Sequence, residues 1–318
     1  MMDRNLVAPG TGTGFTRRSL GATGPRVGEK LIRAALALCA AVSVLITTGI
    51  VLSLLFGTVD FFRAVPVTDF LFGTAWAPSF ADAEFGVLPL VVGTLNIVFW
   101  ALLVAVPVGL LSAIYLAEYA PAGVRKVVKP VLEVLEGVPT VAIGLFALLF
   151  LRPLAEDVLP FLPWRTPFSV GVAGVAVGLL IVPLVASVSD DAMRAVPANL
   201  REGAYALGAS KLRVSLRVVL PAAISGIIAG VVLGVSRAVG ETMVVLMAAG
   251  ARPDITIDPT RSVQTMTAYI GQTATGDIAT GTVDYYTIFA VGALLFAITL
   301  AMNLFAIRLV RRFREVYE

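Results

Sequence analysis

Residues 202–221 read EGAYALGASKLRVSLRVVLP, and this stretch contains the most regular local pattern in the chain. We expect a helix over 198–207 that ends at Gly208, because glycine readily adopts the backbone conformation of a helix C-terminus. A second, amphipathic helix is expected over 210–219, with leucine and valine on one face and arginine on another. The closing Leu-Pro begins a further helix, since proline is tolerated in a first turn. The stretch therefore predicts short helices that meet at a glycine bend.

The composition around this stretch is typical of a membrane protein. Of 318 residues, 58% are hydrophobic and 14% are charged, whereas soluble domains are about 45–50% apolar and about 25% charged. The sequence has no histidine and one cysteine, Cys39. These absences exclude Ser-His-Asp and Cys-His catalysis, histidine-ligated metals and an internal disulfide. We expect a chain that is not an enzyme, with no metal site, no cofactor of its own and no nucleic-acid partner.

Six apolar stretches are long enough to cross a bilayer, which needs about 20 residues in helix. None alternates as barrel strands do, and each span must satisfy its own backbone, so we expect an all-α polytopic membrane protein. The six spans are expected at about 34–59, 87–117, 131–151, 166–189, 221–249 and 285–307. The first is too long and too far along the chain for a cleaved signal peptide. Pro139 and Pro183 are expected to kink their spans.

The distribution of lysine and arginine predicts the orientation. Of the 24 such residues, 18 fall on one side of the six spans, five fall on the other side, and Arg237 lies inside a span. Positive charge is enriched in cytoplasmic loops, so both termini are expected in the cytoplasm. The loop at about 190–220, which contains the opening stretch, is then cytoplasmic as well.

The first 30 residues are rich in glycine, threonine, proline and arginine, and we expect them to form a disordered cytoplasmic tail. The remaining chain, 31–318, is expected to be the transmembrane domain. The run at 10–14 alternates glycine and threonine but lacks the Gly-Lys-Ser/Thr ending of a phosphate loop. If ATP drives this protein, another subunit must hydrolyse it.

The 202–221 stretch resembles the cytoplasmic signature of permease subunits in ATP-binding-cassette (ABC) importers. That signature is Glu-Ala-Ala, three residues, Gly, nine residues, Ile, one residue, Leu-Pro. Gly203 replaces one alanine here and Val218 replaces the isoleucine. The resemblance implies a MetI-like permease fold and a short helix that docks into a groove on the ATPase. The residues carried over to this coupling role are Glu202, Gly203, Ala204, Gly208, Leu220 and Pro221.

Most of the chain after residue 60 is similar to one branch of these permeases, the phosphate-transporting PstC family. The similar segments include 85–89 (FGVLP), 116–121 (LAEYAP), 137–140 (GVPT) and 237–243 (RAVGETM). This resemblance implies a multi-pass subunit in a bacterial inner membrane, in contact with lipid, that imports inorganic phosphate. The implied partners are a sister permease (PstA-like), an ATPase homodimer (PstB-like) holding ATP and Mg²⁺, and an external phosphate-binding protein (PstS-like).

The expected fifth span contains two charges, Arg237 and Glu241. In a continuous helix they are i,i+4 and share a face with Gly230 and Gly234. A charge inside a span is costly unless it faces protein or water, and the guanidinium fork suits an oxyanion. We therefore place these four residues in the substrate pathway, with Glu241 holding the arginine when no anion is bound. The alternative is structural: glycines allow close helix packing, and the two charges neutralise each other.

Uncharged polar residues within the spans are weaker candidates. Thr94 and Asn96 are included in the pathway set, although hydrogen bonding between helices is an equally ordinary role for them and for Asn303. Glu133 and Glu136 are expected at the cytoplasmic boundary.

Three other functions stay open beside a phosphate permease. The first is a related ABC permease that imports sulfate or molybdate. The second is a secondary transporter driven by an ion gradient, and the third is a membrane scaffold without a pore. The coupling signature argues against the second, and Arg237 argues against the third.

Overall fold

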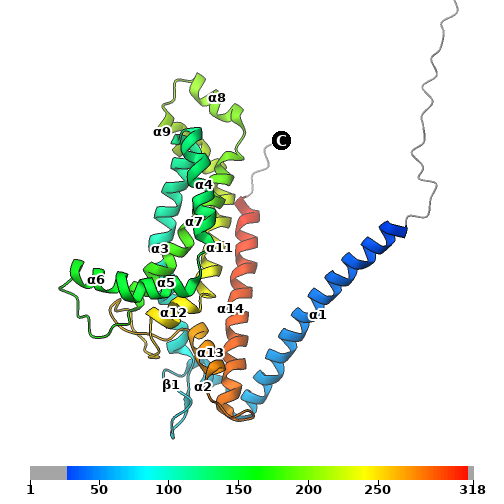
Figure 1. The fold of residues 1–318 in the computed structure, drawn as a ribbon, viewed down its shortest axis with the longest axis vertical. Helices are drawn as coiled ribbons and strands as arrows, with labels where there is room; N and C mark the ends of the chain where they lie inside the picture. The colour runs from blue at the N-terminus through cyan, green and yellow to red at the C-terminus, as the bar shows by residue number, and fades with distance from the viewer. Residues whose placement is uncertain (1–26, 314–318) are drawn as a thin grey trace, which may run out of the picture. The chain divides into compact units, whose positions relative to one another are not determined.

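A computed structural model describes residues 27–313 (Figure 1). The chain separates into two units, 1–51 and 52–318. Residues 1–26 of the predicted tail lie outside the described residues, and residues 27–30 belong to helix α1 (Val27–Ala64). In the first unit the apolar side chains from position 31 to 50 are exposed, which suits a helix surrounded by lipid.

Three helices form the centre of the second unit: α3 (Leu88–Ile114), α7 (Val170–Arg194) and α11 (Ile224–Val239). Small residues bring α7 close to α3, since a Cβ at Gly174 would lie 2.4 Å from the Cβ of Trp100. A Cβ at Gly178 would lie 2.7 Å from the Ala101 carbonyl oxygen. The best-buried helix is therefore one whose glycines admit a neighbouring backbone. Helix α14 (Val283–Phe313) packs beside α11.

The described residues contain four helices that are long and apolar enough to cross a membrane, or up to six if two bent pairs are counted as spans. Expectation and structure agree for α1, α3, α7 and α14. The third span was expected to kink at Pro139, and the fifth was expected to be one helix from about 221 to 249. The expectation for the fifth span is wrong, because α11 ends at Val239. Helix α4 (Ala122–Glu136) meets the run from Thr140 to Val158 at 92°, and 211–222 meets α11 at 70°.

The third span turns at Gly137-Val138-Pro139, which confirms the expected kink at Pro139. Beyond the turn lie α5 (Thr140–Phe146), a π-helix η2 (Ala147–Leu151) and α6 (Arg152–Val158). Proline disfavours helical geometry in the residue before it, which explains the break. In contrast, α7 continues as one helix through Pro183.

Each π-helical turn in the described residues ends two positions before a proline. These turns are η1 (Tyr115–Tyr119) before Pro121, η2 before Pro153, and η3 (Ser215–Val219) before Pro221. Proline has no amide hydrogen and its ring crowds the carbonyl four residues earlier, so the α-helical bond cannot form there. A wider turn relieves this conflict. This rule divides the expected helix 210–219 into α9 (Lys211–Val214) and η3, followed by the short α10 (Leu220–Ala222).

The end of the molecule opposite α8 (Ala198–Ala206) holds small elements that seal the bundle (Figure 1). Helix α2 (Val67–Phe72) leads to the two-residue strands β1 (Trp76–Ala77) and β2 (Glu84–Phe85), which form an antiparallel pair in an otherwise helical fold. Aromatic rings from these elements pack edge to face, including Trp76 on Tyr269 of α13 (Met266–Thr275).

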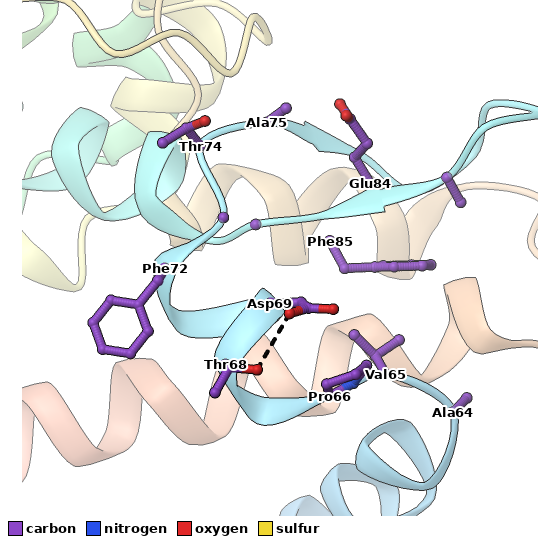
Figure 2. A pocket seen from close by; sticks show the side chains of 13 residues that line it. Ala64, Val65, Pro66, Thr68, Asp69, Phe72, Thr74, Ala75, Glu84 and Phe85 are labelled. Atoms are coloured by element: carbon purple, nitrogen blue, oxygen red, sulfur yellow. Dashed lines mark hydrogen bonds between the residues drawn. The ribbon is translucent and has the colours of Figure 1, made fainter.

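A cavity of about 670 Å³ lies among α2, the end of α1 and the strand pair. Figure 2 shows the Thr68 hydroxyl bonded to Asp69 on α2, while Glu84 on β2 points away from that pair. Below the strands the backbones of Gly73 and Gly86 touch, since a Cβ on either would lie within 2.7 Å of the other residue. The two carboxylates of this cavity do not converge on one point.

Candidate functional site

The segment that carries the signature projects from one end of the molecule (Figure 1). Helix α8 ends at Ala206, and Gly208 has a φ of 78°, which confirms the predicted helix, its end and the glycine bend. Ala204 packs into the cluster below the segment, whereas Glu202 and Gly203 are exposed and Leu207 is 90% exposed. A leucine held in water at the tip of a loop is costly unless another surface covers it. The outer face of α8 is therefore a ready-made contact surface.

Arg201 anchors this segment to the membrane helices, and sequence reasoning missed it. Its guanidinium donates hydrogen bonds to the carbonyls of Met193 (2.7 Å) and Val196 (2.6 Å) at the end of α7. It also forms an ion pair at 3.2 Å with Glu118 of η1, whose side chain is 5% exposed. One planar fork thus joins α8, α7 and η1. No motif marks Arg201, although it directly precedes the signature glutamate.

A second cluster of ion pairs joins α4 to the same end of α7. Arg125 contacts Asp190 at 2.6 Å, and Lys129 lies 3.7 Å from the same carboxylate and also pairs with Asp191. The Asp190 side chain is 1% exposed. A buried carboxylate requires such partners, so α4 is fixed to α7 through charge.

Arg237 lies near the end of α11, where the two bent spans meet. Its guanidinium is 3.4 Å from a carboxylate oxygen of Glu136 and 3.3 Å from the Glu136 carbonyl oxygen. Glu136 is the last residue of α4, at the turn of the third span. Glu136 was expected to sit at the cytoplasmic boundary, and nothing in the sequence indicated its contact with Arg237. Both side chains remain about one-third exposed, at 30% and 34%.

Glu241 does not pair with Arg237, so the expected i,i+4 pair is wrong. Helix α11 ends at Val239, and the chain turns before α12 (Met243–Ala248). The Glu241 carboxylate instead accepts the backbone amides of Met243 and Val244, both at 3.2 Å. The residue is 8% exposed, and its carbonyl accepts the Thr267 hydroxyl at 2.7 Å. Glu241 thus caps α12 in the way acidic residues cap helix N-termini.

The remaining candidates of the pathway set are packing or anchoring residues in the structure. A Cβ at Gly230 would lie 3.1 Å from Val188, and one at Gly234 would lie 2.9 Å from Ile181, so both glycines face α7. The Thr94 hydroxyl accepts the Met266 amide at 3.1 Å, and the Asn96 amide donates to the Thr256 carbonyl at 2.9 Å. These two contacts hold the loop before α13 against α3 and bring neither residue to Arg237. Asn303 accepts the Ser236 hydroxyl at 3.0 Å, a bond between helices.

Residues 27–313 contain no group of three or more His, Cys, Asp or Glu side chains that could hold a metal ion. The chemistry of the described chain is therefore that of guanidinium, carboxylate and hydroxyl groups. Among these groups, Arg237 is a partly exposed cation and Arg201 links α8 to α7 and η1.

Bent spans around a central arginine, with an exposed helical segment at one end, define a multi-pass membrane permease of the ABC importer class. Residues 105–315 match the family described as "Binding-protein-dependent transport system inner membrane component". The chain belongs to this family, and it is the permease subunit of an ABC importer.

Several proteins with assigned names are similar to this chain. It is 31% identical over 249 residues to the "Probable ABC transporter permease protein YqgH" of Bacillus subtilis, covering 78% of each chain. It is 32% identical over 251 residues to the "Phosphate transport system permease protein PstC 1" of Mycobacterium tuberculosis, covering 72% of this chain and 73% of that protein.

Solved structures share the fold at lower identity. The chain aligns with a bacterial ABC transporter that imports the acidic polysaccharide alginate, with a TM-score of 0.62 and 17% identity, over 92% of this chain and 100% of that chain. It aligns with the MetNI methionine ABC transporter with a TM-score of 0.52 and 19% identity, over 72% and 95% of the two chains. The predicted MetI-like permease fold is thereby confirmed.

Proposed function

We propose that this permease translocates inorganic phosphate into the cell as one half of a heterodimeric pore. The observation that carries the proposal is Arg237, a cation that is 30% exposed at the junction of two bent spans. Similarity to phosphate permeases named PstC supports phosphate as the anion. The partners are a sister permease, two copies of a cytoplasmic ATPase that hydrolyses ATP with Mg²⁺, and an external phosphate-binding protein. The α8 end faces the cytoplasm, and so do both termini.

The pairing of Arg237 suits transient binding of an oxyanion. Its contacts with Glu136 are long, at 3.3 and 3.4 Å, and both groups are open to one side. A phosphate oxygen can replace Glu136 on the guanidinium fork, because charge-assisted bonds to phosphate are shorter and stronger. Repulsion from the displaced carboxylate keeps the complex weak, which a permease needs for release. Glu136 takes the part that the sequence suggested for Glu241.

Coupling to ATP hydrolysis belongs to the outer face of α8. Glu202, Gly203 and Leu207 present it to the ATPase, while the Gly208 bend holds it clear of the membrane helices. Movement of α8 reaches α7 and η1 through the Arg201 fork, because that side chain bonds both elements at once. A permease for sulfate or molybdate would use the same parts, since those anions have similar size and charge.

Phosphate uptake by cells carrying Arg237→Gln tests the proposal. Glutamine retains the bulk but loses the charge, so uptake is expected to fall at least about thirtyfold, equivalent to about 2 kcal/mol. Arg237→Lys keeps the charge without the fork and should retain partial activity. Arg308→Gln on exposed α14 is the matched control, and co-purification of all subunits verifies assembly. If Arg237→Gln assembles and transports phosphate normally, the proposed pathway is wrong. If it blocks assembly, Arg237 is structural.

A further inference from the structure

A second group of arginines surrounds a small polar cavity away from Arg237. The cavity is about 200 Å³ and lies between the loop 163–166, which follows α6, and the loop 252–262, which follows α12. Its charged lining residues are Arg165, Arg252, Arg261, Asp254 and Asp258. Serine and threonine hydroxyls complete the wall. The lining can thus offer both positive charge and hydrogen-bond donors.

The convergence of these arginines is unusual for this chain. Only five of its 24 lysines and arginines fall on the side that the charge distribution makes external. Three of those five line this one cavity, although about 90 residues separate the two loops. A fourth, Arg152, donates to the carbonyl of Thr166 at 2.9 Å, and Thr166 is a lining residue. Scarce external positive charge is therefore concentrated at one place.

Two of the three lining arginines have no carboxylate in direct contact among the described residues. Arg261 lies 3.3 Å from Asp254 and 3.7 Å from Asp258, and Arg165 also attracts the Asp258 carboxylate from a greater distance. Arg165 and Arg252 form no ion pair within 4 Å and no hydrogen bond with any other residue in 27–313. Arg165 and Arg252 are exposed, so water satisfies their N–H donors, and an oxyanion can replace that water through stronger charge-assisted bonds.

The cavity is connected to the Arg237 junction by a single short helix. Helix α12 begins beside the junction and has six residues, a length of about 9 Å. At its far end the Ala248 carbonyl accepts the Ser169 amide at 3.0 Å, and the Arg261 carbonyl accepts the Val170 amide at 2.9 Å. These bonds fix both loops to the start of α7. The cavity thus occupies a defined position one helix outward from Arg237.

We propose that this arginine cavity is an outer binding subsite for a tetrahedral oxyanion, which occupies it before reaching Arg237. The assignment rests on the proposed phosphate permease function, but its site is separate. Arg165 and Arg252 bind the anion, while Arg261, held by two carboxylates, shapes the wall. The two aspartates limit affinity by repulsion, which allows the anion to move on. A docking contact for the external binding protein is the competing use of the same arginines.

A thiol-protection experiment distinguishes these uses in the assembled transporter. Ser262 lines the cavity, so Ser262→Cys in a Cys39→Ala background places one reactive thiol there. Inorganic phosphate is expected to slow its modification by an anionic thiol reagent about threefold at twice the dissociation constant. Potassium chloride at equal ionic strength should not slow it. The double variant Arg165→Gln/Arg252→Gln should lose the protection, and Arg63→Gln, an exposed arginine paired with Asp60 outside the cavity, should retain it.

Other outcomes overturn the assignment. Protection by the external binding protein but not by phosphate identifies a docking surface, and equal protection by chloride identifies simple screening. Uptake gives a second measure, since the double variant should lower phosphate uptake about tenfold with assembly unchanged. If phosphate protects the thiol and the Arg237→Gln transporter works normally, the outer subsite is supported and the proposed Arg237 pathway is wrong. If phosphate gives no protection and the Arg237→Gln transporter is inactive, the outer subsite is wrong and the Arg237 pathway is supported.

Discussion

Basic side chains at the two ends of this permease differ in how they are held. At the α8 end, Arg201, Arg125 and Lys129 each contact a carboxylate with a side chain no more than 5% exposed. At the other end, Arg165 and Arg252 have no such partner among the described residues, and Arg261 pairs only with partly exposed aspartates. The first arrangement is permanent because buried ions cannot be left alone. The second leaves cations free to accept an anion.

This difference separates two tasks of an importer. At the α8 end, which the proposed function couples to ATP hydrolysis, ion pairs join α8, α4, α7 and η1. At the other end, Arg165 and Arg252 have no direct ion pair among the described residues, as the proposed outer subsite requires. Arg237 lies between these extremes, since its partner Glu136 is near but only loosely bonded.

The largest effect is expected from Arg201→Ala. The change leaves Glu118 buried without its cation, at a cost of about 3 kcal/mol, the low end for buried pairs because Arg201 retains 20% exposure. If that cost falls entirely on the link between α8 and α7, the phosphate transported per ATP hydrolysed in the reconstituted complex should fall about a hundredfold, since each 1.4 kcal/mol is about a factor of ten. Arg201→Lys should recover only part of the transport-to-ATP ratio, since lysine cannot bond two carbonyls and a carboxylate together. Arg213→Ala on α9 is the control, and an unchanged transport-to-ATP ratio in Arg201→Ala would contradict the linkage role.

Gly208→Val should have the next largest effect. The φ of 78° strains any β-branched residue by about 1–2 kcal/mol, although no atom lies within 4 Å of the new Cβ. That strain corresponds to a loss of about fivefold to thirtyfold in ATPase co-purified with the permease. Gly123→Ala on α4 is the matched control, because Gly123 is helical, has equal space and lies outside the coupling set. Equal ATPase recovery from both variants would show that the bend does not position α8.

A smaller effect is expected at the outer end from Asn96→Ala. The change removes one hydrogen bond, to Thr256, and so loosens the loop that carries Arg252 and Arg261. The cost of about 1 kcal/mol should weaken phosphate protection of the Ser262→Cys thiol about fivefold. Asn303→Ala, which loses an equivalent bond between α11 and α14, should leave that protection intact. Equal weakening by both would indicate general loosening of the bundle.

The smallest effect is expected from pH. The amide and hydroxyl of Thr260 bond the Asp258 carboxylate and hold its pKa below the ordinary value of 3.8. A lowered pKa favours the charged form of Asp258, so the stability that its hydrogen bonds contribute is lost only as pH falls through that lowered value. Asp258 therefore stays charged between about pH 5 and pH 8. Sulfate, which keeps its own charge there, should protect the thiol equally across this range, and a step near pH 6 would contradict the charges assigned to the cavity.

The sequence predicted the membrane class, the α8 helix and Gly208 because each depends on neighbouring residues. An apolar run long enough for the bilayer and a glycine after a short helix are local patterns. It also identified Arg237 as a candidate functional residue, because a charge within a span is costly unless it faces protein or water. It predicted a kink at both Pro139 and Pro183, because the two prolines look alike in an apolar run, yet only Pro139 lies at a helix break and α7 continues through Pro183.

The partner of Arg237 and the gathering of the outer arginines were decided by tertiary structure alone. Helical spacing pairs Arg237 with Glu241 only if the helix continues, and it ends at Val239. Glu136 is 101 positions away in the chain, and Arg165 and Arg252 are brought together only when two loops fold onto α7. Charges act through space, so their partners follow from how the helices pack, which no local pattern records.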